Sequence, residues 1–258
     1  MSSPIAAFES MPDAFGAPIR HGAWEIRPAV AAERAALSAL RGLAFRGGGA
    51  DGDAFDARCL HLWLEDRVAL PGEPLATVRM QLHPEGDLAQ GYAAQFFGLA
   101  ALAQAPGPAL ELGRLCVHPD HQTPDTMRLI WAGLTRVVSA TGAARLIGCT
   151  SFNGTDPEAF GAALRLLAAR HLGPERQRPR ARVKGAVGFA AQVAPPPGPE
   201  ALAQLPPLLR AYLSLGGWVG GDLVIDRDLG TCHVFTCVEI ATMPERRKKL
   251  LRALAGAP

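Results

Sequence analysis

The residues with the clearest potential for chemistry are two charged side chains inside an apolar segment, residues 110 to 117. Glu111 and Arg114 stand three residues apart in the run Leu-Glu-Leu-Gly-Arg-Leu-Cys-Val. A carboxylate in this setting can accept a proton from a nucleophile, or it can pair with the neighbouring guanidinium group, and both interpretations of Glu111 stay open. Backbone N–H groups near Cys116 and Val117 could stabilise an oxyanion if the strand is distorted there.

A second set of charged residues lies upstream, around a glycine-rich segment. Asp51, Asp56 and Arg79 could bind a zwitterion, because an ammonium group needs an acid and a carboxylate fits the fork of an arginine. A salt-bridge network that orders the loop explains the same residues equally well. Arg41 and Phe45 are four residues apart, so they share one face of a predicted helix. These five residues are candidates for substrate binding, with Phe45 as a core residue in the alternative.

Three further polar residues are substrate-binding candidates with plain structural alternatives. His61 follows a leucine in a strand-like run, where a buried core histidine is the alternative. Ser151 stands at a strand end in Thr-Ser-Phe and could equally be a surface or turn serine. Asp226 is either an acid of the pocket or a turn residue.

Three segments look like phosphate-binding or metal-binding motifs, but each lacks a residue that the motif requires. The glycines at 47–49 lack the Lys-Ser/Thr of a phosphate loop. A calcium loop starting at Asp51 would need a glycine at Asp56 and a glutamate at Leu62. His118 and His121 are three residues apart without a third ligand nearby. We therefore expect no metal and no resident cofactor.

Composition limits the class of protein. The 258 residues carry a net charge of only +2, which argues against generic nucleic-acid binding. Two clusters are nonetheless basic, residues 176–184 and residues 246–252, and could attract an acidic protein or an anionic membrane surface. The start lacks the pattern of a signal peptide, and no apolar run reaches the roughly 20 residues of a membrane span. Five cysteines without a C-x-x-C pair favour a reducing cytoplasm.

Periodicity and turn signals place these residues on alternating strands and helices. The central pattern is a strand over 109–117, a helix capped by Thr123-Pro124 and stopped by Gly142, and a strand over 145–152. The other expected helices cover 31–45, 96–102, 156–171, 205–214 and the basic C-terminal segment. The other expected strands cover 24–30, 60–64, 75–82, 223–226 and 232–240, with a turn region at 216–221.

The strand, loop, helix and strand over 109–152 resemble the acyl-donor-binding core of the GNAT superfamily. From about residue 40 to 249 the chain resembles the bacterial amino-acid N-acyltransferases that make the lyso form of ornithine lipid, and its first half is distantly similar to acyl-homoserine-lactone synthases. Order and spacing carry the resemblance, through Leu40-Arg41, Phe45, Asp51, Phe55-Asp56, His61-Leu62, Val78-Arg79, Leu110 to Val117, Ile147 to Ser151, Gly154 to Pro157, Leu205 to Leu208, Tyr212-Leu213, Leu215-Gly216, Asp226 and Gly230-Thr231.

The resemblance implies an α/β fold with a mixed, splayed central sheet flanked by helices and a C-terminal extension. It implies domains at 1–21 (flexible lead-in), 22–192 (acyltransferase core) and 193–258 (extension). The implied reaction moves a 3-hydroxy fatty acyl group from an acyl carrier protein to the α-amino group of ornithine, with Glu111 as base. Leu60, Leu115, His121-Gln122 and His233 depart from the family pattern, so glutamine is the alternative acceptor. A signal synthase and a non-catalytic lipid-binding protein on the same scaffold are two competing hypotheses.

The turn after the central strand favours a carrier protein over coenzyme A as the donor. In coenzyme A enzymes of this superfamily, backbone amides of a glycine-rich turn hold the pyrophosphate. Residues 120–126 contain no glycine, Pro124 removes one amide donor, and Asp120 and Asp125 would repel a polyanion. The basic cluster at 176–184 is the expected docking site for an acidic carrier protein. The terminal cluster is then expected at the inner face of the cytoplasmic membrane, and the two assignments could be exchanged.

Overall fold

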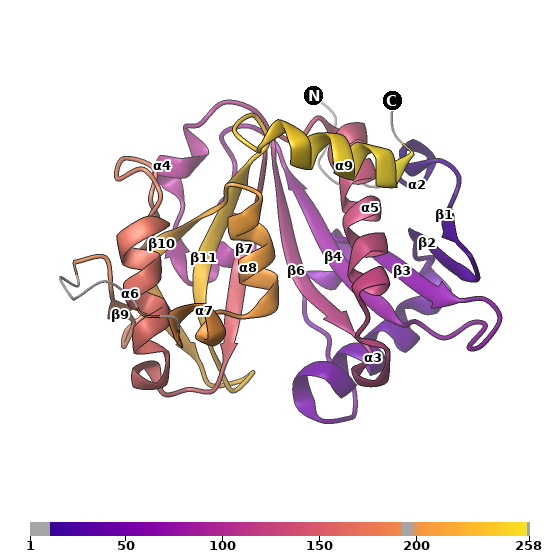
Figure 1. Cartoon of the computed structure of the whole chain (residues 1–258), viewed down its shortest axis with the longest axis horizontal. Coiled ribbons are helices and arrows are strands. Elements are labelled where there is room, and N and C mark those ends of the chain that lie inside the picture. The colour runs from indigo at the N-terminus through magenta and orange to yellow at the C-terminus, as the bar shows by residue number, and fades with distance from the viewer. Residues whose placement is uncertain (1–10, 192–197, 199, 257–258) are drawn as a thin grey trace. The chain divides into compact units, whose positions relative to one another are not determined.

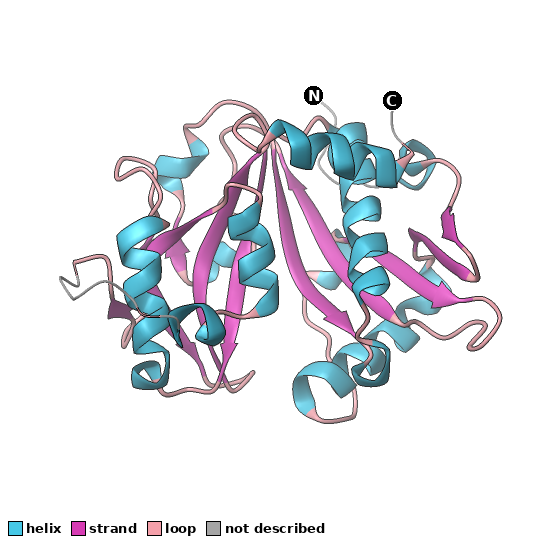
Figure 2. Cartoon of the chain, viewed as in Figure 1, coloured by secondary structure: helices cyan, strands magenta, loops and turns pink. Residues whose placement is uncertain are grey.

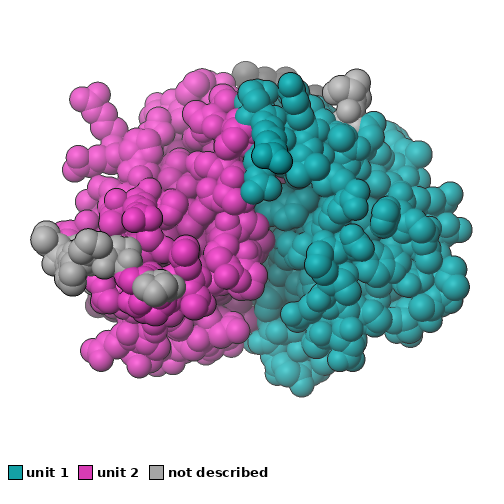
Figure 3. All heavy atoms as spheres, viewed as in Figure 1, with its two compact units in different colours: residues 1–82, 112–143, 245–258 teal, residues 83–111, 144–244 magenta. Residues whose placement is uncertain are grey.

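The computed structural model describes residues 11–191, 198 and 200–256. The chain forms two compact units (Figure 3). Unit 1 comprises residues 1–82, 112–143 and 245–258, and unit 2 comprises residues 83–111 and 144–244. Each unit alternates strands and helices (Figure 2), as the mixed α/β class predicts. None of the helices in the described ranges combines the length and apolar character needed to cross a membrane.

Unit 1 is built on strands that follow the order β1, β2, β3, β4, β6. Their bounds are Ile19–His21, Trp24–Pro28, Leu60–Asp66, Ala76–His83 and Ala109–Val117. The last residue of β4 and the first three residues of β6 belong to unit 2. Pairing from β1 to β4 is antiparallel, and the register sets His61 opposite Arg79. Because opposite residues point to the same face of a sheet, two of the predicted site residues lie side by side.

Unit 1 also contains helices α2 (Met11–Phe15), α3 (Arg34–Arg46), α5 (Pro124–Thr141) and α9 (Glu245–Ala255) (Figure 1). Helix α5 packs so tightly on the sheet that a Cβ at Gly133 would lie 2.8 Å from Leu62. The predicted cap is confirmed, since Thr123 Oγ1 accepts a hydrogen bond from Thr126 N and Gly142 ends the helix at φ 63°. Short 3₁₀ turns precede α3 and β3 and follow β6, at Ala31–Glu33, Asp56–Arg58 and Pro119–His121.

Unit 2 is built on strands in the order β7, β11, β10, β9, all antiparallel. Their bounds are Arg145–Asn153, Thr231–Glu239, Trp218–Asp226 and Val187–Gly188. Cys232 and Val234 pack in one apolar cluster with helices α6 (Gly161–Arg170), α7 (Glu200–Gln204) and α8 (Pro207–Ser214). The 3₁₀ turn Pro157–Phe160 leads into α6.

The other face of that sheet carries a second apolar cluster, which includes Ile147, Trp218 and Phe235. It is covered by the 3₁₀ turn η3 (Ala93–Gln95), strand β5 (Phe97–Gly98) and helix α4 (Ala100–Ala103). Strand β5 pairs with β8 (Arg180–Ala181), at the basic segment 176–184. Alternate residues of β11 therefore serve two different cores, as the period of a strand requires.

Three local predictions are wrong. Residues 1–10 lie outside the described residues, but residues 13–21 are not a flexible lead-in, because Phe15 and Ile19 are buried and β1 pairs with β2. The expected helix over 96–102 is interrupted by β5. The expected turn at 216–221 is wrong from residue 218 on, where β10 begins. Gly220 and Gly221 lie at an irregularity of this strand, and their lack of a Cβ lets Pro179 and Ala190 approach closely. The predicted linker at 194–199 falls almost wholly outside the described residues, and the boundary of the extension at 193 stays a prediction.

Candidate functional site

The glycine-rich loop after α3 is folded back onto that helix. Gly47 ends α3 in the left-handed region at φ 72°. Gly42 must be a glycine, because a Cβ there would lie 2.1 Å from the carbonyl oxygen of Gly49. Asp51 N donates to Ser38 O, and Ser38 Oγ donates to Asp51 O, both at 3.0 Å. These contacts hold Asp51 next to the arginine side chains of α3, Arg41 and Arg46.

Asp51 is the centre of a buried ion cluster. Its side chain is fully buried, and it accepts hydrogen bonds from Arg41 Nε at 3.0 Å, Arg46 Nε at 2.9 Å and Arg114 Nε at 2.9 Å. The three cations come from the middle and the C-terminal end of α3 and from β6. The predicted residues Arg41, Asp51 and Arg114 are therefore brought together.

Asp56 and Asp53 extend the same cluster to β4. Arg41 binds Asp56 through both Nη atoms, at 2.8 and 2.9 Å. Arg79 Nη1 donates to Asp53 at 2.5 Å and to Asp56 at 2.8 Å. Four guanidinium groups thus face three carboxylates, which leaves one positive charge in excess. Asp53 was not among the predicted site residues. Its position two residues after Asp51, in Asp-Gly-Asp, was the sequence feature that could have indicated it.

The cluster stabilises the charged states of Asp51, Asp56 and Arg79. Burial of Asp51 opposes ionisation, but Arg114 and Arg41 outweigh it and hold the pKa of this carboxyl below its usual range. Burial also opposes ionisation of Asp56, and hydrogen bonds from Arg41 and Arg79 hold its pKa well below the usual range. The pKa of Arg79 is raised, because Asp53 and Asp56 outweigh its burial.

Phe45 and His61 support this cluster from its edges. The guanidinium carbon of Arg114 lies 6.0 Å from the ring centre of Phe45. His61 is buried, and its Nε2 lies 3.1 Å from Asp56 O, so it donates to that carbonyl. Burial lowers the pKa of His61, which keeps the ring neutral. A contact of either residue with substrate stays a prediction.

Strand β6 is distorted at Arg114. Among the described residues it is the one non-glycine with a φ in the left-handed region, at 50°. Such a conformation costs about 1–3 kcal/mol and persists only where surrounding contacts enforce it. The distortion fits the predicted oxyanion role of the N–H groups of Cys116 and Val117. Burial raises the pKa of the Cys116 thiol to about 12, so its sulfur is not a nucleophile.

In unit 2, the carboxylate of Glu111 organises a loop. Its Oε2 accepts hydrogen bonds from His83 Nε2 at 3.0 Å and Tyr92 N at 2.9 Å, and its Oε1 accepts one from Ala93 N at 2.7 Å. Gly91 packs against this carboxylate so closely that a Cβ would lie 2.4 Å from Oε2. Three donors use three of about four acceptor positions of a carboxylate. His83 and Tyr92 carried no signal in the sequence.

Ser151 and Asp226 take different places in unit 2. Ser151 is exposed on β7 and lies opposite His233 of β11. Asp226 Oδ1 accepts hydrogen bonds from Asp228 N and Leu229 N, at 3.0 and 3.1 Å. Asp226 therefore shapes the turn between β10 and β11, which was the structural alternative for this residue.

The start of α5 has few free donors for an anion. Pro124 has no N–H, Thr126 N is bound to Thr123 Oγ1 at 3.2 Å, and Met127 N points to Thr123 O at 3.5 Å. The side chains of Asp120 and Asp125 are 86% and 54% exposed. A helix start of this kind is a poor site for a pyrophosphate, because anions bind where free N–H groups and positive charge coincide.

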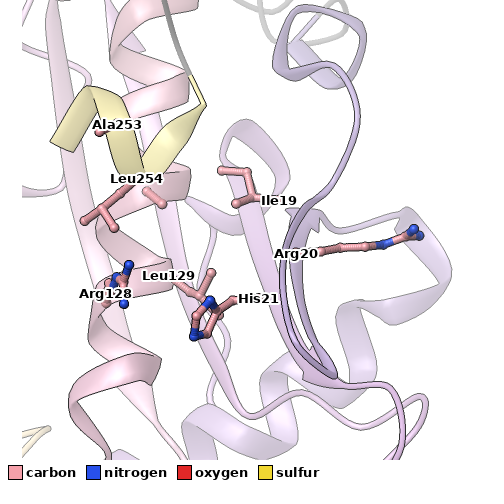
Figure 4. Close-up of a pocket in the computed structure, with 8 residues that line it drawn as sticks. Ile19, Arg20, His21, Arg128, Leu129, Ala253 and Leu254 are labelled. Carbon is pink, nitrogen blue, oxygen red and sulfur yellow. The ribbon is translucent and has the colours of Figure 1, made fainter. Parts of the chain in front are cut away.

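One pocket of unit 1 lies away from all of these residues. It has a volume of about 120 Å³ and lies between β1, α5 and α9 (Figure 4). Its lining includes Ile19, Leu129 and Leu254, while Arg20 extends away from it. This volume is below the roughly 300–1,000 Å³ of typical small-molecule pockets, so we do not place the acyl chain there. In the ranges that the structure describes, no group of three or more His, Cys, Asp or Glu residues could hold a metal ion.

Comparison with known proteins identifies relatives of this chain. Residues 41–132, which contain the ion cluster, match the acetyltransferase (GNAT) domain family. The L-ornithine N(alpha)-acyltransferase of Rhodobacter capsulatus is 34% identical over 204 residues, or 77% of this chain and 78% of that protein. The protein of the same name from Rhizobium meliloti is 31% identical over 216 residues, or 80% of this chain and 72% of that protein. The structure of an N-acyl amino acid synthase from uncultured soil microbes is 13% identical, with a TM-score of 0.49, and the match covers 88% of this chain and 93% of that one.

The protein is a GNAT-type N-acyltransferase, and the predicted α/β fold is confirmed. More closely, the chain belongs to the L-ornithine N(alpha)-acyltransferase family, because relatives of that name are 30–34% identical over most of both chains.

Proposed function

We propose that this chain transfers a 3-hydroxy fatty acyl group from an acyl carrier protein to the α-amino group of ornithine. The observation that carries the proposal is the buried Arg–Asp cluster of unit 1. Its excess positive charge suits the carboxylate of an amino acid. Oδ2 of Asp53 accepts no hydrogen bond and lies 3.5 Å from Arg114 Nη2. This oxygen suits the side-chain ammonium group of ornithine, the amino acid named in the relatives.

In the proposed reaction, the neutral α-amine attacks the thioester carbonyl carbon. A C–N bond forms, the C–S bond breaks, the amine loses a proton to a base, and the carrier leaves as a thiol. Glu111 remains the proposed base. His83, Tyr92 and Ala93 leave about one acceptor position of its carboxylate free, and the proton of the amine would be accepted there. Backbone N–H groups at Cys116 and Val117 are the proposed donors to the oxyanion, where the distortion at Arg114 changes the course of β6.

The start of α5 supports a carrier protein as the donor. A carrier-bound acyl group presents one phosphodiester on its pantetheine arm, whereas coenzyme A also carries a pyrophosphate that needs several donors. With the N–H of Thr126 occupied and that of Pro124 missing, the start of α5 offers few donors to that pyrophosphate.

The decisive experiment supplies the purified protein with 3-hydroxytetradecanoyl carrier protein and labelled ornithine or glutamine, and identifies the lipid by mass spectrometry. We expect N-acylornithine as the main product, and much slower transfer from the coenzyme A thioester. In the Asp53→Asn variant, KM for ornithine should rise about tenfold, because one charge-assisted hydrogen bond is lost. Glutamine as the faster acceptor, with no response of KM to Asp53→Asn, would refute the ornithine assignment.

Two basic surfaces are candidates for docking the acidic carrier. Residues Arg176, Arg180, Arg182 and Lys184 are exposed along the segment that includes β8. Helix α9 exposes a second set, Arg246, Arg247, Lys249 and Arg252, around Leu250, which is 51% exposed. An apolar side chain amid cations suits an anionic membrane surface. We therefore assign the carrier protein to the first surface and the inner membrane face to α9.

Charge reversal separates the two assignments. Arg176→Glu with Lys184→Glu is expected to raise KM for the acyl carrier protein about tenfold at low salt and to leave kcat unchanged, because steering acts on association. The matched control is Arg247→Glu with Lys249→Glu on α9, which should leave that KM unchanged. A rise in KM confined to the α9 variant would exchange the two roles.

A further inference from the structure

Two buried polar atoms of unit 2 have no hydrogen-bond partner and lie on one face of one strand. They are His233 Nε2 and Thr231 Oγ1. The residues are two apart on β11, so their side chains point to the same face. His233 as a whole is 2% exposed. A buried polar atom without a partner costs free energy, which indicates a role that the ligand-free chain does not show.

The face around these atoms changes from polar to apolar along the strands. Thr231 lies opposite Asn153 of β7, which is exposed, whereas Phe235 lies opposite Cys149. His233 stands between these two rows. Beyond Phe235 the face continues as the apolar cluster with Ile147 and Trp218. That apolar part is filled by the packed side chains of η3, β5 and α4, so a ligand would meet the face at its polar end, where the hydrogen-bonding atoms lie.

The surface opens directly beside His233. Ser151, its partner in register, is exposed, and directly opposite residues have Cβ atoms about 5 Å apart. Phe96 covers the imidazole edge-on, with ring centres 4.6 Å apart, and is itself only half-buried. A ligand that displaces the ring of Phe96 from this position therefore reaches His233 from solvent.

The imidazole is suited to an uncharged partner. Burial lowers the pKa of His233 to about 4, against the opposing effect of Asp226, so the ring is neutral at ordinary pH. A neutral imidazole has one donor and one acceptor nitrogen, and a hydroxyl group can both donate and accept. A hydroxyl therefore satisfies Nε2 in either tautomer, whereas a carboxylate would need the ring to donate.

We propose that His233 Nε2, assisted by Thr231 Oγ1, hydrogen-bonds the 3-hydroxyl group of the acyl chain at the polar end of this face. The inference rests on the proposed function, since it takes the acyl donor as the ligand. His233 is then a specificity-determining residue for the acyl donor.

The test compares carrier proteins loaded with 3-hydroxytetradecanoate or with tetradecanoate. We expect wild-type kcat/KM to be higher for the hydroxylated chain, by about tenfold for one hydrogen bond. His233→Phe should abolish that preference. His233→Gln, which keeps a polar atom near the place of Nε2, should restore part of it. An unchanged preference in His233→Phe, or none in the wild type, would overturn the proposal.

A matched pair of threonines provides a readout that does not depend on turnover. Thr231→Val removes a hydroxyl without a partner, so the Tm should stay level or rise. Thr236→Val, on the opposite face of β11, removes a hydroxyl that bonds Thr150 Oγ1 at 3.0 Å, so the Tm should fall and the chain preference should stay. A fall in Tm for Thr231→Val equal to that for Thr236→Val would show that Thr231 is already satisfied and would refute its assignment.

Binding separates failure of the inference from failure of the proposed function. The probes are the pantetheine thioesters of 3-hydroxytetradecanoate and tetradecanoate, titrated against wild type and His233→Phe by calorimetry. A hydroxyl preference in Kd that His233→Phe removes supports the site even if no amino acid is acylated. Transfer to ornithine with equal Kd values for both probes leaves the proposed function standing and removes the role of His233.

Discussion

Asp51→Asn is expected to lower the free energy of unfolding by about 3–5 kcal/mol, the usual cost of breaking a buried ion pair. The side chain of Asp51 is fully buried and forms ion pairs with Arg41, Arg46 and Arg114. An asparagine of the same shape leaves these cations with one negative charge fewer, and its amide N–H₂ group faces guanidinium donors. Chemical denaturation followed by circular dichroism measures the loss.

The acid dependence of the same variant gives a second test. The folded-state pKa of Asp51 is lowered from an ordinary value of about 3.9. Its contribution to stability is therefore present above about pH 4 and is lost as the pH falls through the folded-state pKa. The gap between wild type and Asp51→Asn should narrow in acid. Asp120→Asn, at a side chain 86% exposed, is the control and should change stability by less than about 0.5 kcal/mol. Equal stabilities of wild type and Asp51→Asn at neutral pH would contradict the role of the cluster.

Glu111→Gln is expected to lower kcat by about 100-fold or more, the usual contribution of a general base. It should also loosen the segment at η3, because the N–H₂ group that replaces one carboxylate oxygen cannot accept the hydrogen bonds that His83 and Tyr92 donate to Oε2 or that Ala93 donates to Oε1. The loss of one hydrogen bond to a charged group costs about 1.5–3 kcal/mol. Single-turnover kinetics and amide hydrogen exchange at Tyr92 and Ala93 measure the two effects separately.

The combination of readouts assigns the role of Glu111. Lost turnover with unchanged exchange at Tyr92 indicates direct proton transfer. Lost turnover with faster exchange shows that Glu111 acts by holding the segment that carries Phe96. Glu85→Gln is the matched control, since Glu85 Oε2 also accepts a backbone hydrogen bond, from Gly107 N at 3.0 Å, but is exposed. Full turnover of Glu111→Gln would exclude it as the base.

Much of the fold could be predicted because its signals are local. The strand 109–117, the cap at Thr123 and the stop at Gly142 were predicted at the residues where the structure has them. Predictions failed where a distant partner decided the conformation. Phe97 is a strand residue because it pairs with Ala181, and the glycines before Leu223 are strand residues because β10 lies between β9 and β11.

By itself, the sequence determined the order of the elements, the acyltransferase family and most members of the Arg–Asp cluster, because propensities, caps and motif spacing are properties of neighbouring residues. Only the tertiary structure decided which charges meet. Arg114 pairs with Asp51 across 63 positions of the chain, and Glu111 is bound by donors of a loop about 18 positions away. The buried, unpaired Nε2 of His233 was likewise invisible, because burial and the lack of a partner depend on all the segments that pack around one atom.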